Sequence, residues 1–558
     1  MGIRQAIKRT PAWAKISIGI FLLLMLGGTI GLNAYLNKLV NKRLREMVLE
    51  SSDGLYRLEY SGVSMNAFSG NITIHNAQLI PDTAVFTRLR QSRHAPRFLI
   101  AGKTESVSLR NVRWLAFVNS KKLNIGKLII QNPQFNLTQY RQHNGNDSAH
   151  KPAGIFNFVS KHVKDLKLGL FSIDDAVIHY QVADTLARMR TINTIEHLRL
   201  GFRKVHFAGD TEQDRRLAAD DYYIELKEYR HRTGDSMYWL GMTGLKYNSK
   251  QGIASMASFY SEPRYNEEEF SRKTGFQATR YALELKNISA EGFDVTALVQ
   301  DRIVRMRKMN VDSGSAQFYM NRAYPLPKED KKNVVLSQKI LNLDFPLSID
   351  SLNLKNFTLS YREYQPNSGQ TAVLSFQGIS GRAGNVTNLP AVIARNPQMK
   401  ASLSARFLGA EVKASLSFAL DKPDGSFGAT LDINQVAAEK LNPILTPMAL
   451  IEARDGILQK LECTISGTEN RAMADVKLLY EDLKINLLEK SGGTLEKKGF
   501  KSMFANILVW DDNPKDGALR TSRQSTSRKH GKSFFNLAWS AVAAGILDII
   551  LKEKGIRL

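Results

Sequence analysis

Cysteine is almost absent from this sequence, which limits how the fold can be stabilised. Cys463 is the one cysteine in 558 residues, so an intramolecular disulfide and paired-cysteine metal or redox motifs are excluded. The core must therefore hold together by packing. Cys463 alternates with Leu461 and Ile465, a pattern that predicts a small buried apolar residue.

Signatures of enzymes are also lacking. The sequence contains no HExxH, GxSxG, P-loop or GxGxxG motif. The ten histidines are scattered. The carboxylate pair Asp174–Asp175 falls at a predicted hairpin turn, where Asp is favoured for structural reasons. We therefore predict that the protein is not an enzyme and that it has no cofactor and no metal site.

Negative charge is scarce relative to positive charge. The formal net charge is +24, while 43% apolar and 23% charged residues exclude global disorder. Such a charge suggests an anionic partner, which could be nucleic acid, an anionic membrane or an acidic glycolipid. Outside the N-terminus and the stretches 38–45 and 513–532 the basic residues are spread out, so we expect no nucleic-acid partner.

Long apolar runs are lacking except near the two ends. Residues 16–37 carry no charge and are long enough to cross a bilayer. Basic residues precede this run and acidic ones do not, which predicts a cytoplasmic tail (1–15), a transmembrane anchor (16–37) and a bulk outside the cytoplasm. A cleaved signal peptide is the less favoured alternative, because the run is long and no A-x-A site follows it.

The rest of the chain alternates between apolar and polar residues with a period of two, which predicts a mainly β protein. A repeat also emerges, in which a short apolar helical patch precedes a strand, a turn and a second strand. The turns fall at Asn-Pro, Asp-Asp, Ser-Gly or Lys-Asn, residues that supply the backbone angles of tight turns. Any antiparallel protein gives such hairpins, but the recurring patch favours a repeat. The four copies are Trp114–Tyr140, Phe156–Tyr180, Val295–Met320 and Val334–Tyr361.

The predicted fold is an elongated, twisted antiparallel sheet built from these short-helix–strand–turn–strand units. Composition divides the remainder of the chain into segments. They are a juxtamembrane helix (38–50), an N-terminal β-rich repeat region (51–320), a linker and strand (321–345), a C-terminal β region (346–490), a flexible basic linker (491–532) and an amphipathic helix (533–551).

The C-terminal helix carries an apolar stripe at helical spacing, with Asn536, Ser540 and Asp548 largely off it. It could cap the β structure or span a membrane. We favour a helix that docks, through this stripe, on a membrane surface or on an outer-membrane or envelope protein. The candidate docking face is Phe534, Leu537, Ala541, Val542, Ile546 and Ile549.

Three stretches resemble the AsmA superfamily of bacterial envelope proteins, which includes AsmA-like and TamB-like members. They are Leu55–Asp82 behind the anchor, the patch and strand pair at Trp114–Tyr140, and Ala449–Leu488, which ends in a Y-x-D-L-x-h-x-L pattern beginning at Tyr480. The central region 201–281 matches no pattern of the family. The resemblance implies a sheet folded into a groove with one apolar face, in a single-pass inner-membrane protein with its bulk in the periplasm.

The resemblance also implies a function, which is to bind or move phospholipids, or other anionic envelope lipids, between membranes and to support outer-membrane integrity. An aliphatic inner face could shield acyl chains from water. The alternative is a structural or regulatory scaffold for outer-membrane assembly that carries no lipid. The candidate groove-lining residues are Leu128, Ile130, Phe135, Leu137, Leu352, Leu354, Phe357 and Leu359.

Overall fold

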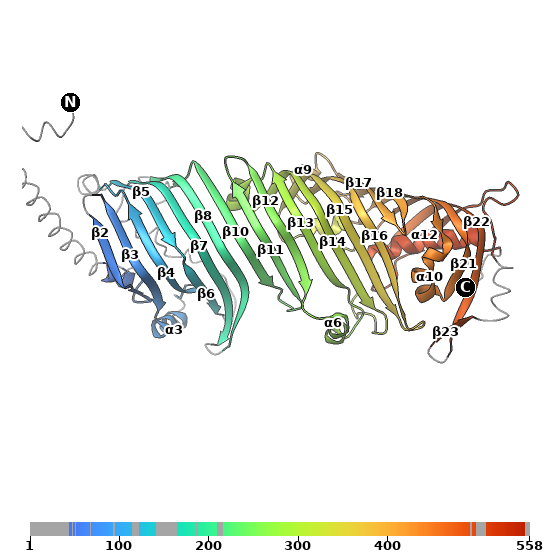
Figure 1. Cartoon of the computed structure of the whole chain (residues 1–558), viewed down its shortest axis with the longest axis horizontal. Coiled ribbons are helices and arrows are strands. Elements are labelled where there is room, and N and C mark those ends of the chain that lie inside the picture. Colours follow the sequence, from blue (N-terminus) through green and yellow to red (C-terminus); the bar gives the residue numbers. More distant parts are fainter. Residues whose placement is uncertain are drawn as a thin grey trace, which may run out of the picture. The chain divides into compact units, whose positions relative to one another are not determined.

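The computed structural model describes residues 44–46, 48–50, 52–66, 69–92, 95–96, 98–113, 122–140, 165–185, 188–208, 216–491, 494–497 and 509–552. These residues are mainly β-strand, as the alternating sequence predicted (Figure 1). The chain divides into two compact units, the first within residues 1–231 and 244–251 and the second within residues 232–243 and 252–558. This division falls inside the unmatched region 201–281 and differs from the predicted one at 321–345.

The first unit is a mixed sheet. Strands β1 and β2 pair with β3, β3 pairs with β4, and β4 pairs with both β5 and β6. Strands β5 and β6 pair in turn with β7, and β8 joins β7 to β9 and β10. The strands are β1 (Tyr56–Glu59), β2 (Gly62–Asn66), β3 (Asn71–Pro81), β4 (Leu99–Arg110), β5 (Lys122–Gln131), β6 (Gln134–Tyr140), β7 (Asp165–Thr185), β8 (Arg188–Ala208), β9 (Arg216–Ala218) and β10 (Asp221–Arg232). Helix α3 (Thr83–Gln91) packs through the buried Phe86 on a small core with Leu99 and Tyr140.

The second unit is a longer mixed sheet. Pairing follows chain order from β12 to β19 and then passes to β21, β22 and β24, while β20 pairs with β21 and β23 with β22. Strand β11 (Tyr238–Asn248) is divided between the units. The other strands are β12 (Ile253–Pro263), β13 (Arg280–Glu291), β14 (Val304–Asn321), β15 (Leu347–Gln365), β16 (Gln370–Thr387), β17 (Gln398–Phe407), β18 (Ala410–Ala419), β19 (Phe427–Ile433), β20 (Val436–Ala437), β21 (Ile451–Gly467), β22 (Arg471–Ser491), β23 (Thr494–Lys497) and β24 (Thr521–Ser527).

Short helices decorate the second unit, and one longer helix lies near the end of the chain. The main core gathers where β21 and β22 meet this longer helix, α12. The helices are α6 (Glu267–Thr274), α7 (Val295–Asp301), α8 (Leu336–Leu341), α9 (Pro390–Ile393), the 3-10 turn η1 (Ala438–Leu441), α10 (Asn442–Ala449) and α12 (Phe534–Ile550). Helices α7 and α8 confirm the apolar helical patches that open the last two repeat copies.

The predicted hairpins inside the repeats are wrong. Strand β7 continues through Asp174–Asp175, β14 continues through Gly314, and β15 continues through Asn356. Asp175 and Asn356 have positive φ, and the strand register shifts beside both of them. These residues therefore form β-bulges, which need the same left-handed backbone angles as tight turns.

The prediction of a wholly antiparallel sheet is wrong for the same reason. The strand segments of each repeat copy run in one direction and do not fold back as a hairpin. Successive copies therefore run parallel to each other. Strands β5 and β6 both run parallel to β7, and β14 runs parallel to β15. Parallel neighbours require a crossover connection, and between β14 and β15 this connection is residues 322–346, which include α8. The segment 321–345 is thus part of the second unit.

The predicted anchor (16–37) and cytoplasmic tail (1–15) lie outside the described residues. Of the predicted juxtamembrane helix, residues 44–46 and 48–50 are described, and they are helical. Among the described residues, no helix is both long and apolar enough to cross a membrane.

Candidate functional site

Two rows of apolar side chains cross the sheet of the first unit from strand to strand. Residues paired across neighbouring strands point to the same face of a sheet, so each row forms part of one surface. All of these side chains except Ile72 keep part of their surface exposed. The first row is Ile72, Leu109, Leu128, Phe171, Phe202 and Tyr222, and the second is Ile74, Val107, Ile130, Ile173, Leu200 and Ile224.

The structure places four predicted lining residues on this surface. Leu128 and Ile130 belong to the two rows. Phe135 is paired with Ile178 and Leu137 with Tyr180. These later pairs lie on the same face because of the bulges. From Ile173 to Ala176 strand β7 advances by three residues while β8 advances by two, so the extra residue is absorbed in the bulge and the side chains do not change face. We call this surface the first apolar face.

Aromatic rings continue the first row across the sheet. The rings of Phe171 and Phe202 stack with centroids 6.2 Å apart, and Phe202 stacks on Tyr222 at 5.9 Å. Tyr222 contacts Tyr247 in turn, with centroids 5.8 Å apart. Offset aromatic pairs at these separations are attractive. They therefore favour the observed strand register and add to the apolar surface of this face.

The second unit has a corresponding surface, which we call the second apolar face. It contains the other four predicted lining residues, because Leu352 and Leu354 lie in its two long rows and Phe357 and Leu359 follow them beyond the bulge at Asn356. One row is Met256, Ile288, Val311, Leu354, Gly381, Leu403, Ala414, Leu431, Cys463 and Val476, and the other is Ala254, Ala290, Met309, Leu352, Ala383, Ala401, Leu416, Ala429, Ile465 and Ala474.

Burial along the second apolar face is uneven. Leu354 and Leu403 are partly exposed, whereas the neighbours of Leu403 on the opposite face, Ser402 and Ser404, are exposed. At β21 and β22 the same face is closed, because Val476 is 2% exposed and Cys463 is 4% exposed. Cys463 is thus buried, as predicted, and burial raises the pKa of its thiol to about 11.

Helix α12 is what closes this end of the face. An ideal Cβ on Gly545 would lie 2.5 Å from Cγ2 of Val476, so the helix backbone rests directly on β22. The helix begins at its N-cap Ser533, and the ring of Phe534 meets Phe427 at a centroid distance of 4.6 Å. Near its C-terminal end, Ser522 Oγ donates a 2.6 Å hydrogen bond to Asp548.

The predicted docking face of α12 therefore faces the sheet. Most of its residues are fully buried and Ile546 packs against the same core, which corrects the interpretation of this stripe as a surface for membranes or partners. The segment predicted to be a flexible linker is also structured where it is described, since β24 pairs with β22 over residues 521–527. The helix instead caps the β structure, as the alternative interpretation of this segment expected. The buried residues of the former docking face are Phe534, Leu537, Ala541, Val542 and Ile549.

The opposite side of α12 carries an exposed stripe that was not predicted from the sequence. Phe535 is 74% exposed and Trp539 is 49% exposed. Asn536 and Ser540 follow them one position later and line a polar pocket with Arg322. In an α-helix these two pairs form adjacent stripes along the axis. The sequence identified the stripe that packs, but it did not show that this stripe packs on the sheet of the same chain.

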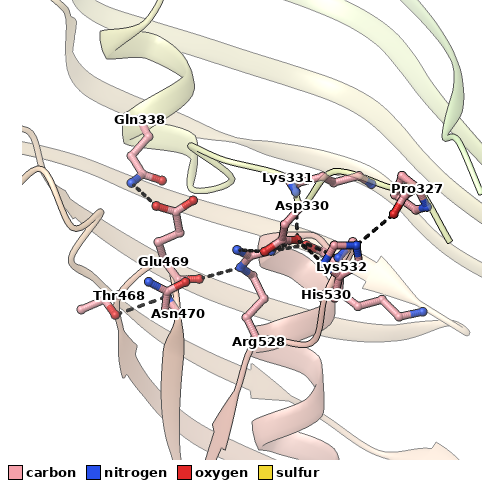
Figure 2. A network of polar contacts seen from close by, with 11 residues as sticks. Pro327, Asp330, Lys331, Gln338, Thr468, Glu469, Asn470, Arg528, His530 and Lys532 are labelled. Carbon is pink, nitrogen blue, oxygen red and sulfur yellow. Dashed lines mark hydrogen bonds and ion pairs between the residues drawn. The ribbon is translucent and has the colours of Figure 1, made fainter.

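A polar network joins the crossover before α8 to the start of α12 (Figure 2). Arg528 binds Asp330 through two nitrogens, at 3.0 and 2.8 Å, and Gly531 donates its N–H to the same carboxylate at 2.7 Å. The Arg528 guanidinium and this N–H hold the pKa of the Asp330 carboxyl well below its usual range. Arg528 also donates to the backbone of Glu469, and thereby ties the β21–β22 turn to the same junction.

No group of three or more His, Cys, Asp or Glu side chains in the described residues could hold a metal ion. A scan against models of known protein families finds none that matches this chain, and a search of curated proteins finds no match either.

Proposed function

We propose that this chain handles lipids in the bacterial envelope, as a membrane-anchored protein of AsmA-like type whose apolar faces bind acyl chains. The observation that carries the proposal is the continuity of the apolar rows. Their side chains stay partly exposed across the first apolar face, apart from Ile72, and from β15 to β19 of the second apolar face. Soluble proteins rarely leave such large contiguous apolar surfaces unused. Covering roughly 100 Å² of such a surface contributes about 2.5 kcal/mol at roughly 25 cal/mol per Å².

Several features support the proposal. One is the sequence resemblance to the AsmA superfamily, together with the mainly β fold of the described residues. Another is the formal net charge of +24, which favours anionic lipids and membrane surfaces. The charge-free run at 16–37 supplies the anchor in this proposal, and the bulk of the chain then lies in the periplasm.

Photocrosslinking in the full chain tests the proposal. A photoreactive amino acid at Ile130 or Leu354, on the apolar faces, should capture phospholipid in cells. The matched controls are Lys127 and Lys355, which are exposed positions on the same strands. Equal capture at Lys127 and Ile130 would contradict a lipid-binding face.

The scaffold alternative predicts a different outcome. It is favoured by the closed end of the second apolar face, where Val476 and Ala474 are fully covered. If no position on either face captures lipid while the protein remains essential for envelope integrity, the scaffold function replaces lipid binding. A reporter fused to the C-terminus that is active in the cytoplasm would contradict the proposed location.

A further inference from the structure

A pocket of about 390 Å³ lies beside the exposed side of α12. Asn536 and Ser540 form the helix wall. The ends of β14 and β15 form the opposite wall, and the turn that precedes α12 contributes two lysines. The lining residues are Arg322, Glu363, Gln365, Pro366, Lys529, Lys532, Asn536 and Ser540.

The one carboxylate in this pocket is already neutralised. Glu363 accepts from Arg322 at 2.6 Å and from the amide of Gln365 at 2.6 Å. The hydroxyl of Tyr361 also donates to it. The side chains of Arg322 and Glu363 are 13% and 4% exposed, so this pair is fixed within the protein. The charge that remains available to a ligand is therefore that of Lys529 and Lys532.

Neither of these lysines has a carboxylate within 4.0 Å of its Nζ among the described residues. Burial lowers the pKa of the Lys532 ammonium and the neighbouring Arg322 lowers it further, while the Glu363 carboxylate opposes both effects. Lys532 is partly buried and Lys529 is exposed, and positive charges that lie close together are stabilised by an anion. The N-terminal turn of α12 adds its helix dipole to the same side.

The pocket borders an apolar strip, which narrows the class of ligand. Phe535 and Trp539 are exposed beside Asn536 and Ser540 on the same helix. A ligand that uses both stripes needs an anionic group with several acceptor oxygens and an attached apolar part. Resting on the proposed lipid-handling function, we propose that this pocket binds the phosphate of an anionic phospholipid, with Lys529 and Lys532 as its charged ligands.

Titration of the full chain, purified in a neutral detergent, tests this site. The probe is a short-chain soluble phosphatidylglycerol, and the readout is calorimetric affinity. The comparison ligands are inorganic phosphate and the matching neutral short-chain diacylglycerol. The test variant is K529Q/K532Q. The control variant, K400Q/K422Q, removes the same charge from exposed lysines elsewhere in the second unit.

We expect K529Q/K532Q to weaken phosphatidylglycerol binding about 100-fold, since each charge-assisted contact contributes about a factor of ten. The control variant should bind like the unmodified chain. Hydrogen exchange of α12 in both variants should be unchanged, which shows that the helix remains docked.

Three results would overturn the headgroup site. The first is unchanged phosphatidylglycerol affinity in K529Q/K532Q. The second is equal affinity for the neutral diacylglycerol. In that case the protein binds acyl chains, and the proposal of a headgroup site is wrong. The third is inorganic phosphate that binds as tightly as the lipid, which would assign the pocket to a free anion. If neither lipid binds at all, the proposed function fails together with this site.

Discussion

Replacing Gly545 with alanine tests how closely α12 is held on the sheet. A new Cβ at this position would lie 2.5 Å from Cγ2 and 3.0 Å from Cβ of Val476. Val476 is stiff at χ1 and 2% exposed, so it has little room to move. Overpacking of this kind destabilises by about 1–3 kcal/mol. Alanine also raises the helix propensity by about 1 kcal/mol relative to glycine.

The two terms have opposite signs, which makes the experiment decisive. For a docked helix the clash exceeds the gain in propensity, so G545A should destabilise α12 by up to about 2 kcal/mol. For an undocked helix only the propensity term remains, and G545A should stabilise it by about 1 kcal/mol.

A second substitution separates the contact from other effects. V476A alone removes two buried methyl groups and should cost about 2 kcal/mol. In V476A/G545A the methyl group added to the helix meets the space left by the valine, so the two effects should not add. We expect a favourable coupling of about 1–2 kcal/mol, within the range measured for residues in contact.

Hydrogen exchange of α12 and β22 peptides in the full chain measures this local stability. The control is G234A, because a Cβ on Gly234 meets nothing within 4 Å. Stronger protection of α12 in G545A than in the unmodified chain would refute the docked arrangement. Strictly additive effects in the double variant would refute the direct contact with Val476.

Three further predictions concern polar and aromatic side chains of the second unit. Because the pKa of Asp330 is lowered by Arg528, its contribution is present above the unfolded value of about 3.9 and is lost as the pH falls further. D330N should therefore lower the urea midpoint at neutral pH and flatten the acid dependence, and an unchanged acid transition would contradict this. E363A leaves Arg322 buried without its partner and should destabilise by about 3–5 kcal/mol, which denaturant unfolding measures. Y480A removes a side chain that is 1% exposed and should cost about 3–5 kcal/mol; a loss below about 1 kcal/mol would show that the strand repacks.

The alternation of the sequence was sufficient to predict the apolar faces. Leu128 and Ile130, or Leu352 and Leu354, lie two residues apart, and a strand can place such pairs only on one side. The apolar character of Cys463 followed from the same alternation. These properties depend on neighbouring residues in one strand, so no knowledge of the tertiary structure was needed.

The direction of the chain at the repeat joints could not be predicted in this way. Asp175 and Asn356 adopt positive φ in bulges, and the same residue types adopt it in hairpin turns. A turn and a bulge therefore look the same in the local sequence. A turn produces an antiparallel hairpin, whereas a bulge leaves a continuous strand that can lie beside a parallel neighbour. Only pairing with distant strands distinguishes them.

The residues of the basic pocket could not be predicted from the sequence either. Arg322, Glu363 and Lys532 are far apart in the sequence, and none stands in a recognisable motif. The sequence by itself determined that the chain alternates into strands with an apolar face, because alternation is a local property. Tertiary structure alone decided that the apolar stripe of α12 packs on that face and which charges meet beside it, because these depend on where a long crossover and a C-terminal helix come to rest on one set of strands.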